Sequence, residues 1–152
     1  MPTTRAAAVL DTLVSTLAAV PALTGRVWDG PPVTGDPLPE VVTVGYAFDD
    51  DDDTAVDIRQ EYHDLGPAAK RDETLDVLCA AYAANGDGDM AAARARAVTL
   101  LGAVETALRA NPGLGLADAL RTELTVGTMR QAQTAQGTAC IVQFTVTATC
   151  LI

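Results

Sequence analysis

Residues 27–46 read VWDGPPVTGDPLPEVVTVGY, in which a short apolar segment breaks into a connector rich in Pro, Gly and Asp before a second apolar segment begins. Residues 26–29 are predicted to form a short strand and residues 40–48 a longer one, because β-branched residues fit a pleated surface. The prolines of residues 30–39 stiffen the connector, since each fixes φ and removes a backbone donor. The stretch therefore predicts two strands joined by a stiff connector.

The length and composition of the chain are those of one domain with one core. It has 152 residues, of which 49% are hydrophobic, enough for a radius of gyration of roughly 15 Å. We expect a single domain over residues 1–152, with residues 46–72 as a protruding arm. Charge, Pro or Gly interrupts every apolar stretch well before the ~20 residues that a membrane span needs. The prediction is a protein that is neither secreted nor membrane-inserted.

The charge of the chain is strongly negative. Twenty acidic residues against ten basic ones give a formal net charge of −10. Surfaces that bind nucleic acid gather Lys and Arg, whereas an acidic surface repels phosphate backbones. We therefore expect no specific nucleic-acid-binding surface.

The three cysteines, Cys79, Cys140 and Cys150, are odd in number and contain no close pair. This spacing suggests neither a disulfide framework nor a CxxC metal site. The apolar sequence around each of them predicts buried, reduced thiols.

Two segments have the apolar spacing of amphipathic helices. The first begins after the Thr3-Thr4 pair, which can cap it, and ends at Pro21. The second is expected over residues 90–110, after a turn in which Asp87 or Asp89 serves as the N-cap. It would be ~30 Å long, about the width of a small sheet. We expect it to lie across that sheet.

Alternating apolar and polar residues predict the remaining strands. Residues 56–63 are expected to be the second strand of a hairpin or arm. Residues 73–83 alternate too, although their alanines make a helix the competing interpretation. After a helical turn over residues 116–121, residues 122–152 are expected to form a hairpin that turns near residues 136–137. The predicted fold class is α+β: a largely antiparallel or mixed β-sheet with two main α-helices packed on it.

An acidic run of five carboxylates, Asp49, Asp50, Asp51, Asp52 and Asp53, separates two of these strands. Mutual repulsion favours an exposed turn here. A calcium-binding loop that started at Asp50 would have Thr54 at its fifth position and Ala55 where the sharp turn requires Gly. A solvated turn is therefore favoured over a divalent-cation site, and no metal or cofactor is predicted.

The chain offers few residues for catalysis. Ser15 is its one serine and His63 its one histidine, and no nucleophile-elbow pattern surrounds Ser15. Lys70 follows Ala69 rather than a glycine-rich loop, so a P-loop is absent. We therefore expect no enzymatic activity.

Trp28, Tyr46, Tyr62 and His63 are candidates for contact with another subunit. Trp28 is the one Trp in a chain with 4% aromatic residues, and it is either the largest core side chain or an interface anchor. His63 precedes Asp64 and could make a pH-sensitive contact. Together with the acidic run, these residues make up the predicted interface.

The order of elements and phrases along the chain resembles one known family. The phrases are VWDGPPVTGDPLPE, VVTVGY, QEYHDLG, KRDET, NGDGD, AAARARAVTLLGAVETALRANPGLGL and QGTACIVQFTVTATCLI. In this order they resemble tail terminator (tail completion) proteins of long-tailed, non-contractile bacteriophages and of prophages of actinobacteria-like hosts. The resemblance covers nearly the whole chain, and the acidic run and the Ala-rich residues 75–84 depart from it.

The resemblance implies a homohexameric ring that caps the head-proximal end of the tail tube. Such a ring stops tube growth and offers a surface to the head-to-tail connector or stopper protein. Its partners would be its own copies, the tail tube protein and the connector, and DNA would pass through its lumen without specific binding. The implied location is the tail or neck of the virion, after assembly in the host cytoplasm. The family has no catalytic residues to transfer.

A ring of subunits that each carry −10 would have an anionic channel wall, past which DNA can slide. The acidic run, Asp57 and residues 87–89 are candidates for that wall, and residues 41–62 for contact with an adjacent subunit. Three alternatives stay open. They are another head-to-tail connector, an enzyme or small-ligand binder built around Trp28, Tyr46, Tyr62 and His63, and a monomeric acidic protein that binds a basic partner.

Overall fold

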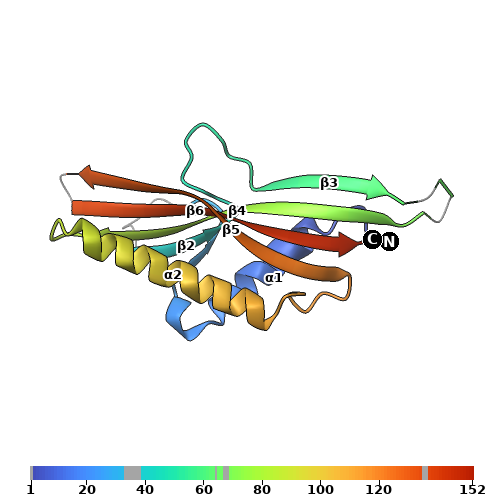
Figure 1. Cartoon of the computed structure of the whole chain (residues 1–152), viewed down its shortest axis with the longest axis horizontal. Helices are drawn as coiled ribbons and strands as arrows, with labels where there is room; N and C mark the ends of the chain where they lie inside the picture. Colours follow the sequence, from blue (N-terminus) through green and yellow to red (C-terminus); the bar gives the residue numbers. More distant parts are fainter. Residues whose placement is uncertain (1, 33–38, 64, 67–68, 135–136) are drawn as a thin grey trace.

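The computed structural model describes residues 2–32, 39–63, 65–66, 69–134 and 137–152, which form an α+β fold (Figure 1). The elements in chain order are α1 (Ala6–Ala18), the 3-10 helix η1 (Pro21–Leu23), β1 (Val27–Asp29), β2 (Glu40–Val44), β3 (Val56–Tyr62), β4 (Arg71–Asn85), α2 (Met90–Ala110), β5 (Ala119–Thr134) and β6 (Gly137–Leu151). The predicted fold class is confirmed. Most of the predicted connector, the Asp64 neighbour of His63 and the Gln136 half of the predicted turn lie outside the described residues.

The described strands form one mixed sheet in the order β1-β2-β4-β6-β5, with β3 also paired to β4. β1 is parallel to β2, and every other pairing is antiparallel. The central strands are the long ones: β4 pairs with β6 from Asp72 opposite Leu151 to Asn85 opposite Thr138. The strand interpretation of residues 73–83 is therefore confirmed, and the competing helix is excluded.

β2 and β3 share one edge of β4 and do not form the hairpin that the sequence predicts. β2 pairs with residues 79–83 of β4 and β3 with residues 71–77, so the two strands follow one another along the same edge. β2 ends at Val44, earlier than expected, because Gly45 and Phe48 have positive φ angles of 75° and 54° that turn the chain out of the sheet. The hairpin partner of β3 is β4 itself.

Both helices cover the same face of the sheet and contribute to one core. The buried positions of α1 are Val9, Leu13 and Leu17, which recur at the predicted helical spacing. Those of α2 are Ala93, Ala97, Leu100, Val104 and Leu108. They meet alternate residues of β4 and β6, such as Val77 and Phe144. Full burial of each larger side chain contributes roughly 1.5–3 kcal/mol, so this shared face is the main source of stability.

The helix ends follow the sequence signals in part. The Asp89 side chain accepts a hydrogen bond from the Ala92 N–H at 3.1 Å and caps α2, whose predicted bounds are confirmed. Thr4 Oγ1 accepts from the Ala6 N–H at 3.1 Å, although the residue at the N-cap position is Arg5. The helical turn expected over residues 116–121 is wrong, because β5 already begins at Ala119.

The three cysteines are free and buried, as predicted. Burial raises the pKa of the Cys79 thiol to about 12 and also raises those of Cys140 and Cys150. Within the described ranges, no helix combines the length and apolar composition needed to span a membrane.

Candidate assembly surface

The sheet face opposite the helices, here called the helix-free face, is polar and half-buried. Its residues on the two central strands include Thr74, Asp76, Leu78 and Tyr82 of β4 and Gln143, Thr145, Thr147 and Thr149 of β6. Threonines dominate β6 on this side, where Thr147 Oγ1 donates to Asp76 Oδ1 at 2.6 Å. Arg59 of β3 also contacts Asp76, at 2.9 Å. Polar side chains on this face therefore contact one another across β3, β4 and β6.

Residues 45–55, here called the acidic loop, fold over this face and are tied to it by three side chains. Thr43 Oγ1 of β2 donates to the Tyr46 carbonyl at 2.6 Å, and Gln143 Nε2 of β6 donates to the Ala47 carbonyl at 2.6 Å. Arg130 Nη2 of β5 donates to the Phe48 carbonyl at 2.7 Å. Successive carbonyls are therefore held by three different strands, which fixes the base of the loop.

Aromatic stacking adds to this attachment. The ring centroids of Tyr46 and Phe48 lie 4.9 Å apart, and Phe48 stacks on Tyr82 of β4 at 5.4 Å with an interplanar angle of 17°. Contacts of this kind contribute roughly 0.5–1.5 kcal/mol beyond burial. Tyr46 therefore anchors the acidic loop to its own subunit, and its contact with another subunit stays a prediction.

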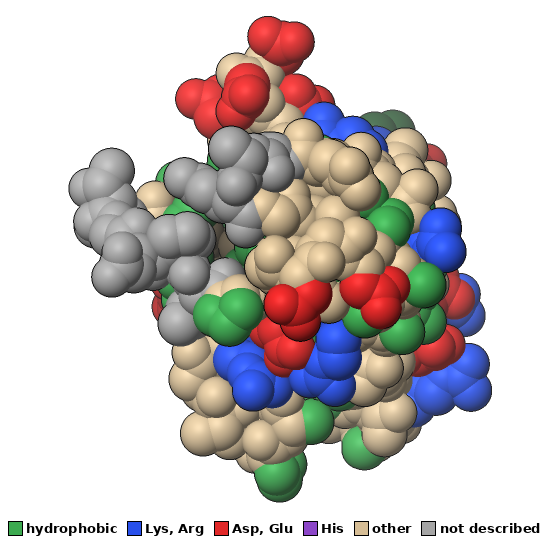
Figure 2. Space-filling model, turned by 90° about the vertical axis from the view of Figure 1, so that its left-hand side faces the viewer, with side chains coloured by type: hydrophobic (Ala, Val, Ile, Leu, Met, Phe, Trp, Pro, Cys, Tyr) green, Lys and Arg blue, Asp and Glu red, His purple; other side chains and the backbone are tan. Residues whose placement is uncertain are grey.

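The tip of the acidic loop presents the acidic run to solvent. Asp49, Asp50, Asp51, Asp52 and Asp53 are all exposed, which confirms the predicted turn. Figure 2 shows acidic side chains gathered at the top of the molecule, where Figure 1 places the loop that leads from β2 to β3. Asp52 Oδ1 accepts from the Thr54 N–H at 2.9 Å. Hydrogen bonds from the Thr54 hydroxyl and backbone lower the pKa of Asp52, which favours the anionic form of this side chain.

The other predicted interface residues lie elsewhere on the molecule. Tyr62 and His63 lie at the far end of β3, where Arg71 Nη1 donates to the Tyr62 hydroxyl at 2.7 Å and His63 Nε2 lies 2.8 Å from Asp72 Oδ2. Trp28 is half-buried on β1, opposite Thr43 of β2. Tyr62 and Thr43 pair with positions of β4 nine residues apart, which is about 30 Å along a strand. The structure therefore does not bring the predicted residues together into one site.

Sequence reasoning missed Arg71 and Asp72 because they reach Tyr62 and His63 across a strand pair. It also missed the exposed edge of β5. The large hydrophobic side chains exposed among the described residues are Ile58, Tyr62, Leu65, Val98, Val126 and Met129. Four of these six lie on β3 and β5, two of the three outer strands of the sheet. Unpaired edges with apolar side chains are templates for a further strand, and the alternation in β5 is the signal that could have indicated it.

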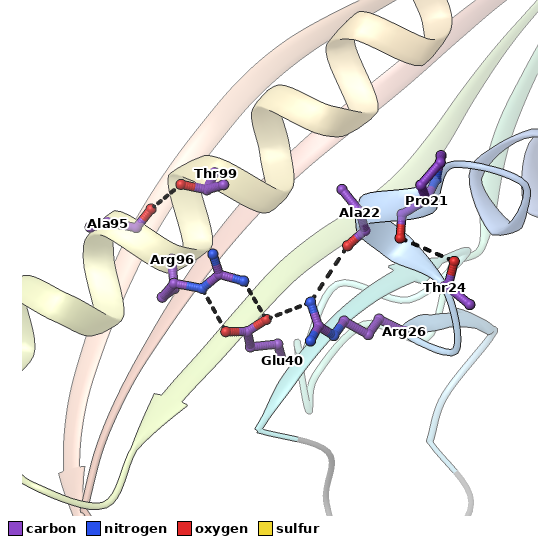
Figure 3. Close-up of polar contacts among 8 residues, drawn as sticks. All are labelled: Pro21, Ala22, Thr24, Arg26, Glu40, Ala95, Arg96 and Thr99. Carbon is purple, nitrogen blue, oxygen red and sulfur yellow. Dashed lines mark hydrogen bonds and ion pairs between the residues drawn. The ribbon is translucent and has the colours of Figure 1, made fainter.

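A charged cluster on the helix side has a structural role. Arg96 of α2 donates from Nε and Nη2 to the two carboxylate oxygens of Glu40, at 2.6 and 2.7 Å, and Arg26 Nη1 lies 3.0 Å from Glu40 Oε2 (Figure 3). The hydrogen bonds from Arg96 are the main cause of a lowered Glu40 pKa. The cluster joins the start of β2 to α2.

Within the described residues, no group of three His, Cys, Asp or Glu side chains is placed to hold a metal ion. The geometry that stands out in this part of the chain is a fixed acidic loop over a polar sheet face, together with three strands, β1, β3 and β5, that each pair with a described strand on one side only.

Comparison with known proteins bears on the fold. No protein-family model and no curated protein matches the sequence. Among the solved structures that match is a chain of the virion of a native gene transfer agent (GTA) particle, with a TM-score of 0.55 and 15% sequence identity. The match covers 99% of this chain and 100% of that one. At this identity the likeness establishes a shared fold over the full length of both chains.

Proposed function

We propose that this protein is a structural virion protein, a tail terminator that forms a homohexameric ring at the head-proximal end of a tail tube. The observation that carries the proposal is the full-length fold likeness to a chain of a virion. The order of sequence phrases independently resembles tail terminators of long-tailed, non-contractile phages. In this role the chain acts as one domain, without catalysis or cofactor, in the tail or neck of the virion.

The structure suggests how such a ring would work. Strands that pair edge to edge around a ring leave one sheet face inside and the other outside. We place the helix-free face toward the lumen, because this puts the exposed carboxylates of the acidic loop on the channel wall. An anionic wall repels DNA phosphates, so the genome can slide through without being held. The ring would bind the tail tube protein on one side and the head-to-tail connector on the other.

Light scattering during size-exclusion chromatography, alone and with tail tube protein, tests the proposal. We expect six-subunit rings, formed either in free solution or on the end of a tube, and tubes that stop growing when the protein is added. Binding to connector protein but not to tube ends would instead place the ring at the neighbouring connector level. A persistent monomer that leaves tube length unchanged would contradict the proposal.

A further inference from the structure

β3 and β5 are the two outer strands of one half of the sheet, whose order is β3-β4-β6-β5. In a single row across this half, Val56 lies opposite Val77, Val77 opposite Val146 and Val146 opposite Leu124. Within the described ranges, no strand pairs with the outer edge of either β3 or β5. Because each pairing in the row is antiparallel, β3 and β5 run in opposite directions. A neighbouring copy with its helices on the same side therefore presents β3 antiparallel to β5.

The backbone hydrogen bonds show which residues of β3 have free groups. The Leu78 N–H donates to the Ala55 carbonyl and the His63 N–H to the Lys70 carbonyl, so the odd-numbered residues of β3 point their backbone groups at β4. Hydrogen-bonded and non-hydrogen-bonded pairs alternate along an antiparallel ladder. The N–H and C=O groups of the even-numbered residues, such as Ile58 and Gln60, therefore point outward.

The same reasoning applies to β5. Ile152 exchanges hydrogen bonds with Arg71 of β4, whereas the Leu151 N–H donates to the Asp118 carbonyl on the side of β5. The odd-numbered residues of β6 thus bond toward β5, where Thr147 is opposite Glu123 and Thr149 is opposite Arg121. Between these partners, the even-numbered residues of β5 from 122 to 126 direct their N–H and C=O groups outward.

We propose that β5 of one subunit pairs antiparallel with β3 of the next, and this proposal rests on the ring proposed above. The hydrogen-bonded pairs are Thr122, Leu124 and Val126 opposite Gln60, Ile58 and Val56 of the neighbouring subunit. All six residues have the outward-pointing backbone groups that such a ladder requires. The side chains of both sets lie on the helix side of the sheet, so the sheet continues from one subunit to the next without reversing its faces.

The side chains of this register are complementary. On the helix side, two pairs are apolar, Leu124 with Ile58 and Val126 with Val56, and pairing would cover the exposed Ile58 and Val126. On the helix-free face, Arg121 lies opposite Glu61 of the neighbouring subunit and Glu123 opposite its Arg59. These are non-hydrogen-bonded positions, where facing side chains are closest. In the isolated chain Arg121 and Glu123 contact each other, so pairing extends this ion pair into four alternating charges.

The neighbouring registers lack this complementarity. A shift of two residues in one direction places Arg121 opposite Arg59 and Glu123 opposite Asp57, which are like-charge pairs. A shift of two in the other direction places Glu123 opposite Glu61. A shift of one residue mismatches the backbone groups and moves every side chain to the wrong face. The charge pattern therefore favours this register over those displaced by one or two residues.

Disulfide cross-linking tests the register directly. The Arg59→Cys/Glu123→Cys variant places the new thiols opposite each other across the proposed interface. Within one subunit they are separated by β4 and β6, about 14 Å at ordinary strand spacing, too far for a disulfide. We expect mild oxidation to give a ladder of covalent oligomers up to the hexamer on a non-reducing gel, in free solution or in rings docked on tubes. The native thiols are buried, so the wild-type chain gives the background level of cross-linking.

Two matched variants make the result specific. In Arg59→Cys/Arg121→Cys, the second cysteine lies two residues from the position that faces Arg59, about 7–8 Å away on the diagonal. This variant should cross-link at least tenfold less. Arg59→Cys alone should give no covalent dimer, whereas a dimer would show that β3 pairs with itself and would overturn the proposal. Equal cross-linking by the displaced pair, or none by the first variant in rings that light scattering shows to be intact, overturns the register and leaves the proposed function standing. A wild-type chain that forms no ring, free or with tube protein, overturns both.

Charge exchange provides a second test. Glu61→Arg faces Arg121 with a like charge and should raise the protein concentration needed for assembly by on the order of tenfold or more. Adding Arg121→Glu should restore assembly. Asp11→Arg makes the same change of charge on an exposed position of α1 and should assemble as the wild type does. Thermal melts of all variants check that folding is intact, and a double exchange that fails to restore assembly of the folded chain contradicts the register.

Discussion

Gly137 opens β6 in a backbone conformation with a φ angle of 127°, and its surroundings leave no room for a side chain. A Cβ atom there would lie 2.4 Å from the Asn85 carbonyl oxygen. We expect Gly137→Ala to lower the free energy of unfolding by at least roughly 2 kcal/mol, through backbone strain and steric overlap. Urea unfolding measures the effect.

Gly102 of α2 provides the matched control for this prediction. A Cβ atom on Gly102 meets nothing within 4 Å, and alanine is favoured over glycine in a helix by about 1 kcal/mol. Gly102→Ala should therefore raise the free energy of unfolding. If both alanine variants shift the free energy of unfolding in the same direction, the close approach of Gly137 to Asn85 is contradicted.

The Glu40 carboxylate joins the start of β2 to α2 through charge-assisted hydrogen bonds. It accepts two hydrogen bonds from Arg96, and its side chain is 16% exposed against 46% for Arg96. We expect Glu40→Gln to lower the free energy of unfolding by about 1–2 kcal/mol at neutral pH. Glu105→Gln, which removes an exposed i,i+4 ion pair with Arg109, should change it by less than about 0.5 kcal/mol.

The pH dependence of this difference has a defined sign. The folded-state pKa of Glu40 lies below its ordinary value of 4.5, so its contribution is fully present above that value. The contribution is lost as the pH falls through the lowered pKa of the folded state. The gap between wild type and Glu40→Gln, followed by urea unfolding at several pH values, should therefore narrow in acid. A gap that is constant from neutral pH to strong acid would show that the carboxylate charge is not what Arg96 stabilises.

At the scale of elements, the local sequence pattern correctly predicted the helices and strands that depend on one segment. It missed the contacts that depend on the pairing of two segments. The alternation of residues correctly predicted β4 and β6, and the cap residues correctly predicted the bounds of α2. Burial of one face gives each kind of element its own period in the sequence. The hairpin of β2 with β3 was wrong, since an alternating segment does not specify its partner strand. The contact of His63 with Asp72 of β4 was not predicted. That contact depends on the register between strands.

The acidic loop is the element whose attachment is most open to test. The Thr43 hydroxyl is fully buried and donates to the Tyr46 carbonyl at 2.6 Å. Thr43→Val preserves the shape but removes the donor, so we expect a loss of about 1–2 kcal/mol in the free energy of unfolding. Backbone amides in residues 45–55 should exchange faster, because the base of the loop opens more often. Hydrogen exchange followed by mass spectrometry measures this.

Thr147→Val is the control for loop release. Its hydroxyl donates to Asp76 on the same face but touches no carbonyl of the acidic loop. It should lower stability without changing exchange in residues 45–55 more than in the rest of the sheet. If both variants raise the amide exchange rate in residues 45–55 equally, the opening of the loop follows global stability rather than the Thr43 hydrogen bond.

At the scale of the whole molecule, the acidic residues that give the net charge of −10 are distributed unevenly between the two faces of the sheet. The acidic loop concentrates carboxylates over the helix-free face, whereas the helix side ties Glu40 to two arginines. If β3 and β5 close a ring, the exposed carboxylates of every copy converge on one passage. The fold then provides both the means of closure and the electrostatic character of the lumen.

Charge reversal at the acidic loop tests that assignment. In the Asp51→Lys/Asp53→Lys ring, lysines should line the lumen, so we expect the ring to retain a short DNA duplex in a gel-shift assay, with an affinity that falls steeply as salt rises. The wild-type ring should retain none. Asp11→Lys/Glu105→Lys makes the same change of charge at exposed positions of α1 and α2, on the outer side of the proposed ring. DNA that passes through the ring meets only the lysines at positions 51 and 53, so only that variant should retain the duplex. Equal retention of DNA by both variants would place the acidic loop outside the passage.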